Sequence, residues 1–110
     1  MSEYSPDAWR IIKITPWPEK KNQEVIYKVL AGWYGGYLDG DYWKLNSGIT
    51  KIEEDGNFYV FFGYSGSSYR CHKDTERFSV MTSAVFLNLK KEIEDRGGKC
   101  EDVEISNISL

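Results

Sequence analysis

The sequence predicts an α+β fold in which an antiparallel β-meander of about six strands packs against one C-terminal helix. Two observations indicate the meander: runs rich in β-branched and aromatic residues, and the Asp-Gly turn signals at 39–40 and 55–56 that separate them. A third observation indicates the helix, since apolar residues recur at helical spacing over 85–93. We expect residues 1–110 to form a single α+β domain, because a chain of 110 residues fits one hydrophobic core.

The first two strands are expected at residues 9–15 and 24–34. The first is a short apolar run closed by Pro16 and Pro18, because proline cannot donate a hydrogen bond to a neighbouring strand. The second is apolar on both alternating faces, which is typical of a central strand. The dipeptide at 39–40 then predicts a tight hairpin turn.

Three further strands are expected at residues 42–52, 57–62 and 67–72. The second Asp-Gly dipeptide, at 55–56, separates the first pair, and a glycine-containing break at 63–66 separates the second pair. Consecutive strands joined by such short turns pair antiparallel, so these segments extend the meander.

The helix is expected over residues 82–96. Ser79 or Thr82 would cap its N-terminus, and the glycines at 97–98 would end it because glycine readily adopts the left-handed conformation. A final strand at 103–108 is expected to return to an edge of the sheet.

The charge and hydropathy exclude several kinds of partner. With 14 Lys and Arg against 17 Asp and Glu the net charge is −3, whereas a general binder of long nucleic acid needs a sustained positive field. No apolar run reaches the roughly 18 residues of a membrane-spanning helix, and the first residues lack the basic and apolar regions of a signal peptide. We therefore expect no long nucleic-acid partner, no membrane partner and a cytoplasmic location.

The chain has few residues that bind metal. A zinc site needs about four soft ligands, and the chain offers only Cys71, Cys100 and one histidine, His72. We expect both thiols to be reduced and at least partly buried, with a disulfide between them as the alternative. The Asp-Gly-Asp segment at 39–41 looks like the start of a calcium loop, but Thr50 occupies the position where the last acidic ligand is needed. We expect no metal and no cofactor.

Catalysis is the less favoured class of function. The chain contains no GxxxxGK[ST] loop for nucleoside triphosphates and no HExxH motif. Cys71 and His72 are adjacent on an expected strand, so their side chains point to opposite faces and cannot form a catalytic pair. The acidic run at 53–55 precedes a turn glycine and is typical of a solvated loop. We therefore predict a protein that is not an enzyme and has no catalytic residues.

Ligand binding fits the distribution of aromatic residues and glycines. The chain has four Trp, eight Tyr, five Phe and ten Gly, and most of them lie in the meander. Segments 32–37 and 64–70 combine aromatic rings with Gly and Ser, so a base could stack on a ring while its phosphate approaches the backbone. Ser65 and Ser67 could present hydroxyl and N–H groups to that phosphate, and Arg70 could neutralise it.

The candidate ligand site combines aromatic, hydroxyl, amide and guanidinium groups. Its members are Trp33, Tyr34, Tyr37, Trp43, Asn46, Ser47, Tyr64, Ser65, Ser67, Tyr69 and Arg70. Arg70 is the strongest candidate among them. Trp43 shares a strand face with Leu45, which favours a place in the core over a ligand platform, and the segment 64–67 is open to interpretation as a plain turn.

Three segments carry a resemblance to a known family. Residues 32–37 (GWYGGY), 43–49 (WKLNSGI) and 65–71 (SGSSYRC) are together similar to a family of small phage proteins, over somewhat under half of the chain. The functional match that this resemblance suggests is the anti-CBASS nucleotide sponge. It implies an immune-evasion protein of the host cytoplasm that binds a cyclic oligonucleotide signal without cleaving it. It also implies a homo-oligomer with ligands at subunit interfaces.

Two alternatives to a nucleotide sponge remain. One is a phage protein that inhibits a host enzyme by protein–protein contact through an aromatic surface patch. The other is a hydrolase of cyclic nucleotides, which would return cleaved ligand after incubation.

Overall fold

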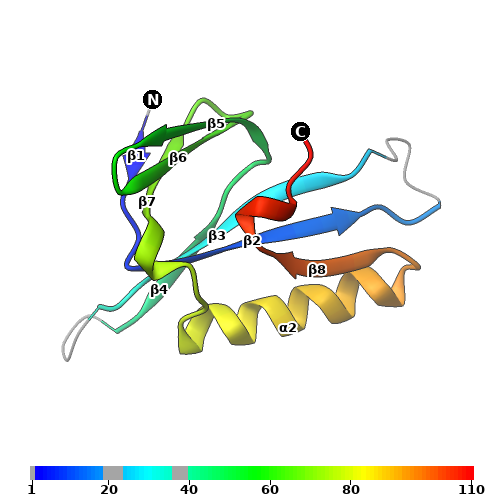
Figure 1. Cartoon of the computed structure of the whole chain (residues 1–110). Coiled ribbons are helices and arrows are strands. Elements are labelled where there is room, and N and C mark those ends of the chain that lie inside the picture. Colours follow the sequence, from blue (N-terminus) through cyan, green and yellow to red (C-terminus); the bar gives the residue numbers. More distant parts are fainter. Residues whose placement is uncertain (1, 19–23, 36–39) are drawn as a thin grey trace.

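Two four-stranded sheets and one α-helix make up the described part of the chain (Figure 1). The computed structural model describes residues 2–18, 24–35 and 40–110. Sheet A has the strand order β1-β7-β6-β5, and sheet B has the order β4-β3-β2-β8. Neighbouring strands in both sheets are antiparallel except β1 and β7, which are parallel. The expected α+β class, with a meander packed against one C-terminal helix, is confirmed.

The chain passes from sheet A to sheet B after β1, returns to sheet A after β4 and enters sheet B again at β8. Sheet A contains β1 (Glu3–Tyr4), β5 (Ile49–Asp55), β6 (Phe58–Gly63) and β7 (Ser68–His72). Sheet B contains β2 (Ala8–Thr15), β3 (Ile26–Trp33), β4 (Tyr42–Leu45) and β8 (Lys99–Val103). The helices are η1 (Lys73–Thr75), α2 (Val80–Asp95) and η2 (Ile105–Asn107), of which η1 and η2 are short 3-10 helices. The strands β2, β3, β6 and β7 lie within two residues of their expected bounds.

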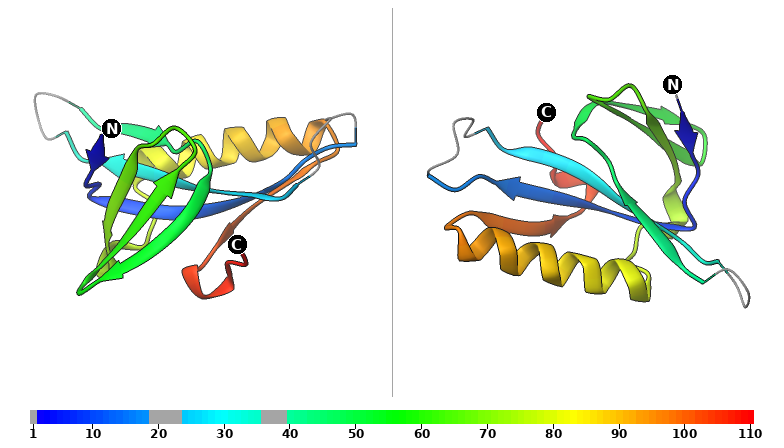
Figure 2. Two further views of the ribbon diagram at one scale, coloured as in Figure 1. Left: turned by 90° about the horizontal axis from the view of Figure 1, so that it is seen from above. Right: turned by 180° about the vertical axis from the view of Figure 1, so that it is seen from behind.

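Sheet B lies between sheet A on one face and α2 on the other (Figure 2). The buried side chains between the sheets are Trp9, Ile11, Tyr27, Val29, Ala31, Ile49, Phe61, Tyr69 and Cys71. Those between sheet B and α2 are Ile12, Ile14, Leu30, Phe86, Ile93 and Cys100. Successive strand residues point to opposite faces, and both faces of sheet B are covered. The strands β2 and β3 therefore carry apolar side chains on both faces. The expectation that β3 is a central strand is confirmed, since it lies between β4 and β2.

The single strand expected over 42–52 is wrong. The chain leaves sheet B after β4 and enters sheet A at β5, so this segment forms two strands in different sheets. The bend between them depends on Asn46, whose side-chain Oδ1 accepts the N–H groups of Val29 at 3.1 Å and of Gly48 at 3.2 Å. Gly48 has a φ of +134°, which side chains other than glycine rarely tolerate. These residues turn the chain from one sheet to the other.

The turns of sheet A follow the sequence signals. Asp55 pairs with Phe58 across a tight turn in which Gly56 has a φ of +58°, so the turn expected at 55–56 is confirmed. The break at 63–66 is also confirmed: Gly66 has a φ of +89°, and its N–H donates to the carbonyl oxygen of Gly63 at 3.0 Å. The hairpin expected at 39–40 falls in part outside the described residues.

The helix α2 begins after Ser79 and ends before Gly97, whose φ is +94°. It starts two residues earlier than expected because the cap is Ser79 and not Thr82. Its N-terminus packs closely on β3: a Cβ atom at Gly32 would lie 2.8 Å from Thr82 Cγ2. The i,i+4 pair of Lys90 and Glu94 forms at 2.9 Å.

Replacing Ser79 by alanine is expected to lower the free energy of unfolding by about 1–2 kcal/mol. The buried Ser79 Oγ accepts the N–H of Thr82 at 3.1 Å, and Thr82 Oγ1 accepts the N–H of Ser79 at 2.7 Å, so the variant loses half of a capping box. Chemical denaturation measures the change. Ser83→Ala, one turn into the helix, is the matched control, and an equal loss in both variants would contradict a capping role.

The last strand was expected at 103–108, but it lies earlier in the chain, at Lys99–Val103. The strand β8 ends at Val103 and is an edge of sheet B, as expected, but 105–107 form η2. The reason is tertiary, because Glu76 Oε2 accepts the N–H of Ile105 at 3.1 Å, and Ile105 packs against the core between the sheets. Within the described residues, no helix has both the length and the apolar character needed to cross a membrane.

Candidate functional site

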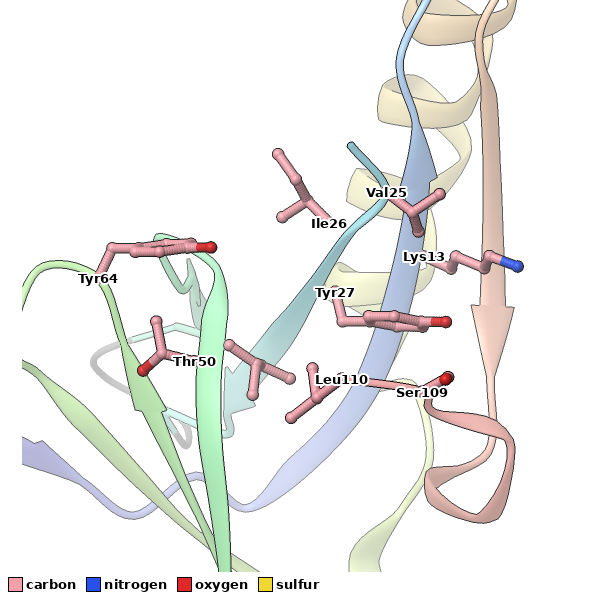
Figure 3. A pocket seen from close by; sticks show the side chains of 9 residues that line it. Lys13, Val25, Ile26, Tyr27, Thr50, Tyr64, Ser109 and Leu110 are labelled. Atoms are coloured by element: carbon pink, nitrogen blue, oxygen red, sulfur yellow. The ribbon is translucent and has the colours of Figure 1, made fainter. Parts of the chain in front are cut away.

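A pocket of about 490 Å³ opens between the edge of sheet A and the first half of β3 (Figure 3). We call it the inter-sheet pocket. It is lined by Lys13, Val25, Ile26, Tyr27, Ile49, Thr50, Tyr64, Ser109 and Leu110. These residues come from β2, from β3 and the residue before it, from β5, from the β6–β7 turn and from the segment after η2. The pocket therefore exists only because five parts of the chain meet there.

Tyr64 forms the wall on the side of sheet A. Its backbone N–H donates to the carbonyl oxygen of Gly48 at 3.2 Å, and the next N–H, of Ser65, donates to Ser47 Oγ at 3.0 Å. A Cβ atom at Gly48 would lie 2.8 Å from two carbons of the Tyr64 ring, so only glycine leaves room for this ring. The phenol is 71% exposed and presents its ring to the pocket. The β4–β5 bend thus fixes the place of Tyr64.

Lys13 and Tyr27 form the opposite wall. They are directly paired between β2 and β3, on the face of sheet B that turns towards sheet A. Lys13 also faces Glu101 across β8, yet its ammonium makes no ion pair within the described ranges. In Figure 3, the Lys13 ammonium and the hydroxyls of Tyr27 and Ser109 point to the side of β8. Polar groups therefore gather at one end of the pocket.

The middle of the pocket is apolar. Val25, Ile26, Ile49 and Leu110 supply its aliphatic surface, and Figure 3 shows Ile26 and Leu110 between the Tyr64 ring and the polar end. Such a site suits a ligand that has a flat apolar part and an anionic group, because the first can pack on the aliphatic wall and the second can reach an unpaired ammonium.

Four of the residues expected from the sequence belong to this region. Tyr64 lines the pocket, while Asn46, Ser47 and Ser65 hold the bend and the turn that place it. Asn46 is only 3% exposed, so it supports the site and does not face a ligand. The structure thus brings these four residues together and gives three of them a supporting role.

Arg70 does not lie in the pocket. Its guanidinium donates to Asp55 Oδ2 at 2.8 Å and stacks 4.5 Å from the centre of the Phe58 ring. Asp55 and Phe58 flank the β5–β6 turn, at the end of sheet A opposite to the turn that carries Ser65 and Ser67. The expected phosphate site of Arg70 with these serines is not formed, because the direction of β7 carries Arg70 away from them.

Neighbouring residues hold the backbone of the 64–67 segment by hydrogen bonds. The N–H of Ser65 is taken by Ser47 Oγ, and the carbonyl oxygen of Ser67 accepts the N–H of Gly63 at 3.0 Å. The backbone of this segment is therefore a plain turn, which was the alternative interpretation. Of its four side chains, only that of Tyr64 lines the pocket.

Tyr69 is a core residue. It is 4% exposed in the cluster between the sheets, and its ring centre lies 5.2 Å from that of Tyr4. Burial is the main cause that raises the pKa of the Tyr69 phenol. The expected role in ligand binding is corrected, because residues in this part of β7 alternate and Tyr69 points inward.

Trp33 and Tyr34 lie at the far end of β3, and Trp43 lies on its partner strand β4. Trp33 stacks on Tyr42 of β4 with ring centres 5.0 Å apart and an interplanar angle of 5°. Tyr34 is 49% exposed and Trp43 is 44% exposed, so Trp43 is not the core residue that its strand face favoured. Tyr37 lies outside the described residues. These rings do not line the inter-sheet pocket.

Both cysteines are free and buried, as expected. Cys71 lies between the sheets and Cys100 between sheet B and α2, so they belong to different layers. Burial raises the pKa of both thiols, that of Cys100 to about 11. Neither is a thiolate nucleophile at neutral pH.

Lys13, Tyr27, Thr50 and Ser109 line the pocket without having been identified from the sequence. Lys13 carried a usable signal, because it is a cation on the strand face that also holds Trp9 and Ile11. A charge on a face that is otherwise core indicates an opening in that core. No comparable local signal marks Ser109.

Comparison with known proteins adds no assignment: no family model, curated protein or solved structure matches the chain. Among the residues that the structure describes, no cluster of His, Cys, Asp and Glu side chains is arranged to hold a metal ion. The chemistry of the site must therefore be derived from the side chains of the inter-sheet pocket.

Proposed function

We propose that the chain binds a small cyclic oligonucleotide in the inter-sheet pocket and holds it without cleaving it. In this role it acts as a phage protein of the host cytoplasm that sequesters an immune signal. The observation that carries the proposal is the placement of the Tyr64 ring, an aliphatic wall and the Lys13 ammonium around one pocket of about 490 Å³, the ammonium making no ion pair with any described residue. This volume lies within the roughly 300–1,000 Å³ of typical small-molecule sites.

The expected contacts follow from the chemistry of the walls. A base stacks on Tyr64, which is worth about 1–3 kcal/mol. A phosphate meets the ammonium of Lys13 and the hydroxyls of Tyr27 and Ser109, which are charge-assisted or neutral donors at the same end of the pocket. Nanomolar binding corresponds to about 12 kcal/mol, so stacking and phosphate contacts must act together with burial of the aliphatic wall.

Isothermal titration calorimetry against a panel of cyclic di- and trinucleotides tests the proposal. We expect at least one of them to bind, and Tyr64→Ala and Lys13→Met to weaken its binding by about 10-fold or more, because one loses the stacking ring and the other the cation. Chromatography after incubation is expected to return the ligand intact. A cleaved ligand would instead identify a hydrolase.

Two matched controls keep the experiment specific. Tyr34→Ala removes a half-exposed tyrosine at the far end of β3, and Lys91→Met removes an exposed cation on α2. Both variants are expected to bind as the original chain does. The proposal is abandoned if no nucleotide binds at micromolar concentration, or if the controls lose as much affinity as the pocket variants.

The second candidate function is inhibition of a host enzyme through an aromatic surface. One observation favours it: Tyr34, Tyr42 and Trp43 are each about half exposed at the end of sheet B where β3 and β4 pair. Recovery of a stoichiometric protein partner from host lysate, lost in Tyr34→Ala, would support inhibition and not sequestration.

A further inference from the structure

The strand β4 is an edge of sheet B that carries little charge. Among the described strands it pairs only with β3. Exposed edges in natural proteins are blunted by charges, because their free backbone groups otherwise pair with another chain. The segment Tyr42–Leu45 carries a single charge, on Lys44, beside two half-exposed aromatic rings.

The other edges of the two sheets are protected. The edge strand β5 carries Lys51 and Glu53, which form an ion pair at 2.7 Å. The edge strand β8 carries Glu101 and Asp102, and its Cys100 carbonyl oxygen accepts the Lys90 ammonium at 2.9 Å. The edge strand β1 is only two residues long. By contrast, β4 combines a single charge with two half-exposed aromatic rings.

The register of β4 determines which of its backbone groups are free. The Asn46 N–H donates to the Val29 carbonyl oxygen at 3.0 Å, on the side of β3. Because hydrogen-bonding direction alternates along a strand, Lys44 and Tyr42 also turn their N–H and C=O groups to β3. The N–H and C=O groups of Trp43 and Leu45 therefore point outward from the edge.

The side chains of the same two residues face an open apolar hollow. Trp43 and Leu45 lie on the α2 side of sheet B and line a hollow of about 250 Å³ together with Val85 and Leu89. Trp43 remains 44% exposed beside it. The strand thus offers free backbone donors and acceptors and an uncovered aromatic surface at one place.

We propose that β4 pairs with β4 of a second copy of this chain, antiparallel about a two-fold axis at Trp43. Residues that face each other across an antiparallel pair share one face of the sheet, and two registers with this property keep most of both strands paired. One places Trp43 opposite Trp43 of the second copy and Tyr42 opposite Lys44. The other places Lys44 opposite Lys44, where like charges destabilise the pair. The first register is the one that forms.

This pairing satisfies the open features of β4 together. The two outward Trp43 N–H groups donate to the two outward Trp43 carbonyl oxygens, and the Trp43 ring of each copy covers the hollow beside Val85 and Leu89 of the other. The inter-sheet pocket lies at Ile26, where β3 begins, whereas β4 pairs with the last residues of β3. Each copy therefore keeps its own pocket, and the dimer forms without ligand.

Sedimentation velocity of the full chain between about 1 and 100 μM measures the dimer, since its population follows mass action. We expect dimer at high concentration. Trp43→Lys places two cations across the axis and is expected to weaken dimerisation by about 30-fold or more. Leu87→Lys, the same kind of change at an exposed position of α2, is the control and is expected to leave the dimer unchanged.

Amide hydrogen exchange of the unaltered chain provides a measurement that does not depend on how a variant folds. The N–H groups of Trp43 and Leu45 are expected to be protected at high concentration and to exchange rapidly on dilution. A chain that stays monomeric across the range overturns the proposal. A dimer that persists in a folded Trp43→Lys variant, or that leaves these two amides unprotected, also overturns it.

Discussion

Replacing Trp9 by alanine is expected to lower the free energy of unfolding by about 3–5 kcal/mol. Trp9 is fully buried between the sheets, with its ring centre 5.3 Å from that of Phe61 and 6.2 Å from that of Tyr59. Its indole N–H donates to the carbonyl oxygen of His72 at 2.7 Å, where β7 ends. The variant therefore loses the buried apolar surface of the indole and its ring contacts, which leaves a cavity between the sheets. It also loses the hydrogen bond from β2 to the end of β7.

Equilibrium denaturation of Trp9→Ala measures this loss, with two comparisons. Trp9→Phe keeps an aromatic ring in the core but has no N–H for His72, so we expect a smaller loss than with alanine. Leu87→Ala removes an exposed side chain on α2 and is expected to change stability by about 0.5 kcal/mol or less. Equal stabilities of Trp9→Ala and Leu87→Ala would show that the sheets do not depend on this contact.

Asn46→Ala is expected to lower the free energy of unfolding by about 2–4 kcal/mol, because it leaves two buried N–H groups without an acceptor. Asn46 Oδ1 accepts from Val29 and from Gly48, and the side chain is almost fully buried. Asn46 Nδ2 has no hydrogen-bond partner in the described part of the chain. The acceptor oxygen, and not the amide as a whole, is what the bend from sheet B to sheet A requires.

The control for this prediction is Asn88→Ala, which removes the same side chain from an exposed position of α2. We expect thermal and chemical denaturation to detect little or no loss in this variant, since alanine is the better helix former. If Asn46→Ala were as stable as Asn88→Ala, the bend would be held by Gly48 and the neighbouring strands alone.

Both predictions concern the connection between the sheets, which is also what creates the candidate site. The β4–β5 bend at 46–48 carries the chain to sheet A and leaves Gly48 beneath the Tyr64 ring. Trp9 ties β2 to the end of β7. A pocket between two sheets keeps its shape only if the sheets stay at a fixed separation. Residues that set this separation are therefore expected to change ligand affinity although they do not line the pocket.

The strand and helix signals in the sequence come from residues a few positions apart. They predicted correctly those elements and turns whose conformation depends on such near neighbours. Apolar and aromatic runs bounded by turn signals identified β2, β3, β6 and β7, the glycine turn at 55–56 has the expected conformation, and α2 ends before Gly97. The prediction of one strand over 42–52 was wrong for a physical reason. The alternation in this segment is continuous through Asn46 to Gly48, and alternation gives the two faces of a strand without saying to which sheet each half belongs.

The candidate site shows the same division. Tyr64 could be identified from its sequence neighbours, since a tyrosine among Gly and Ser residues is exposed. Arg70 could not be placed, because the end of the strand to which it reaches, and its partner Asp55, depend on the pairing of β5, β6 and β7. Lys13 could be recognised as unusual, but the opening that it faces could not.

The sequence by itself determined an α+β chain with an antiparallel meander and a capped C-terminal helix, and it placed most of the aromatic residues in the meander. Only the tertiary structure decided that the meander divides between two sheets, that Tyr69 is core and Trp43 is exposed, and that a pocket forms between Tyr64 and Lys13. The physical reason is the distance along the sequence between the residues that interact. Turns and periodicity are set by residues a few positions apart, whereas pockets and free edges arise where segments distant in sequence pack or fail to pack.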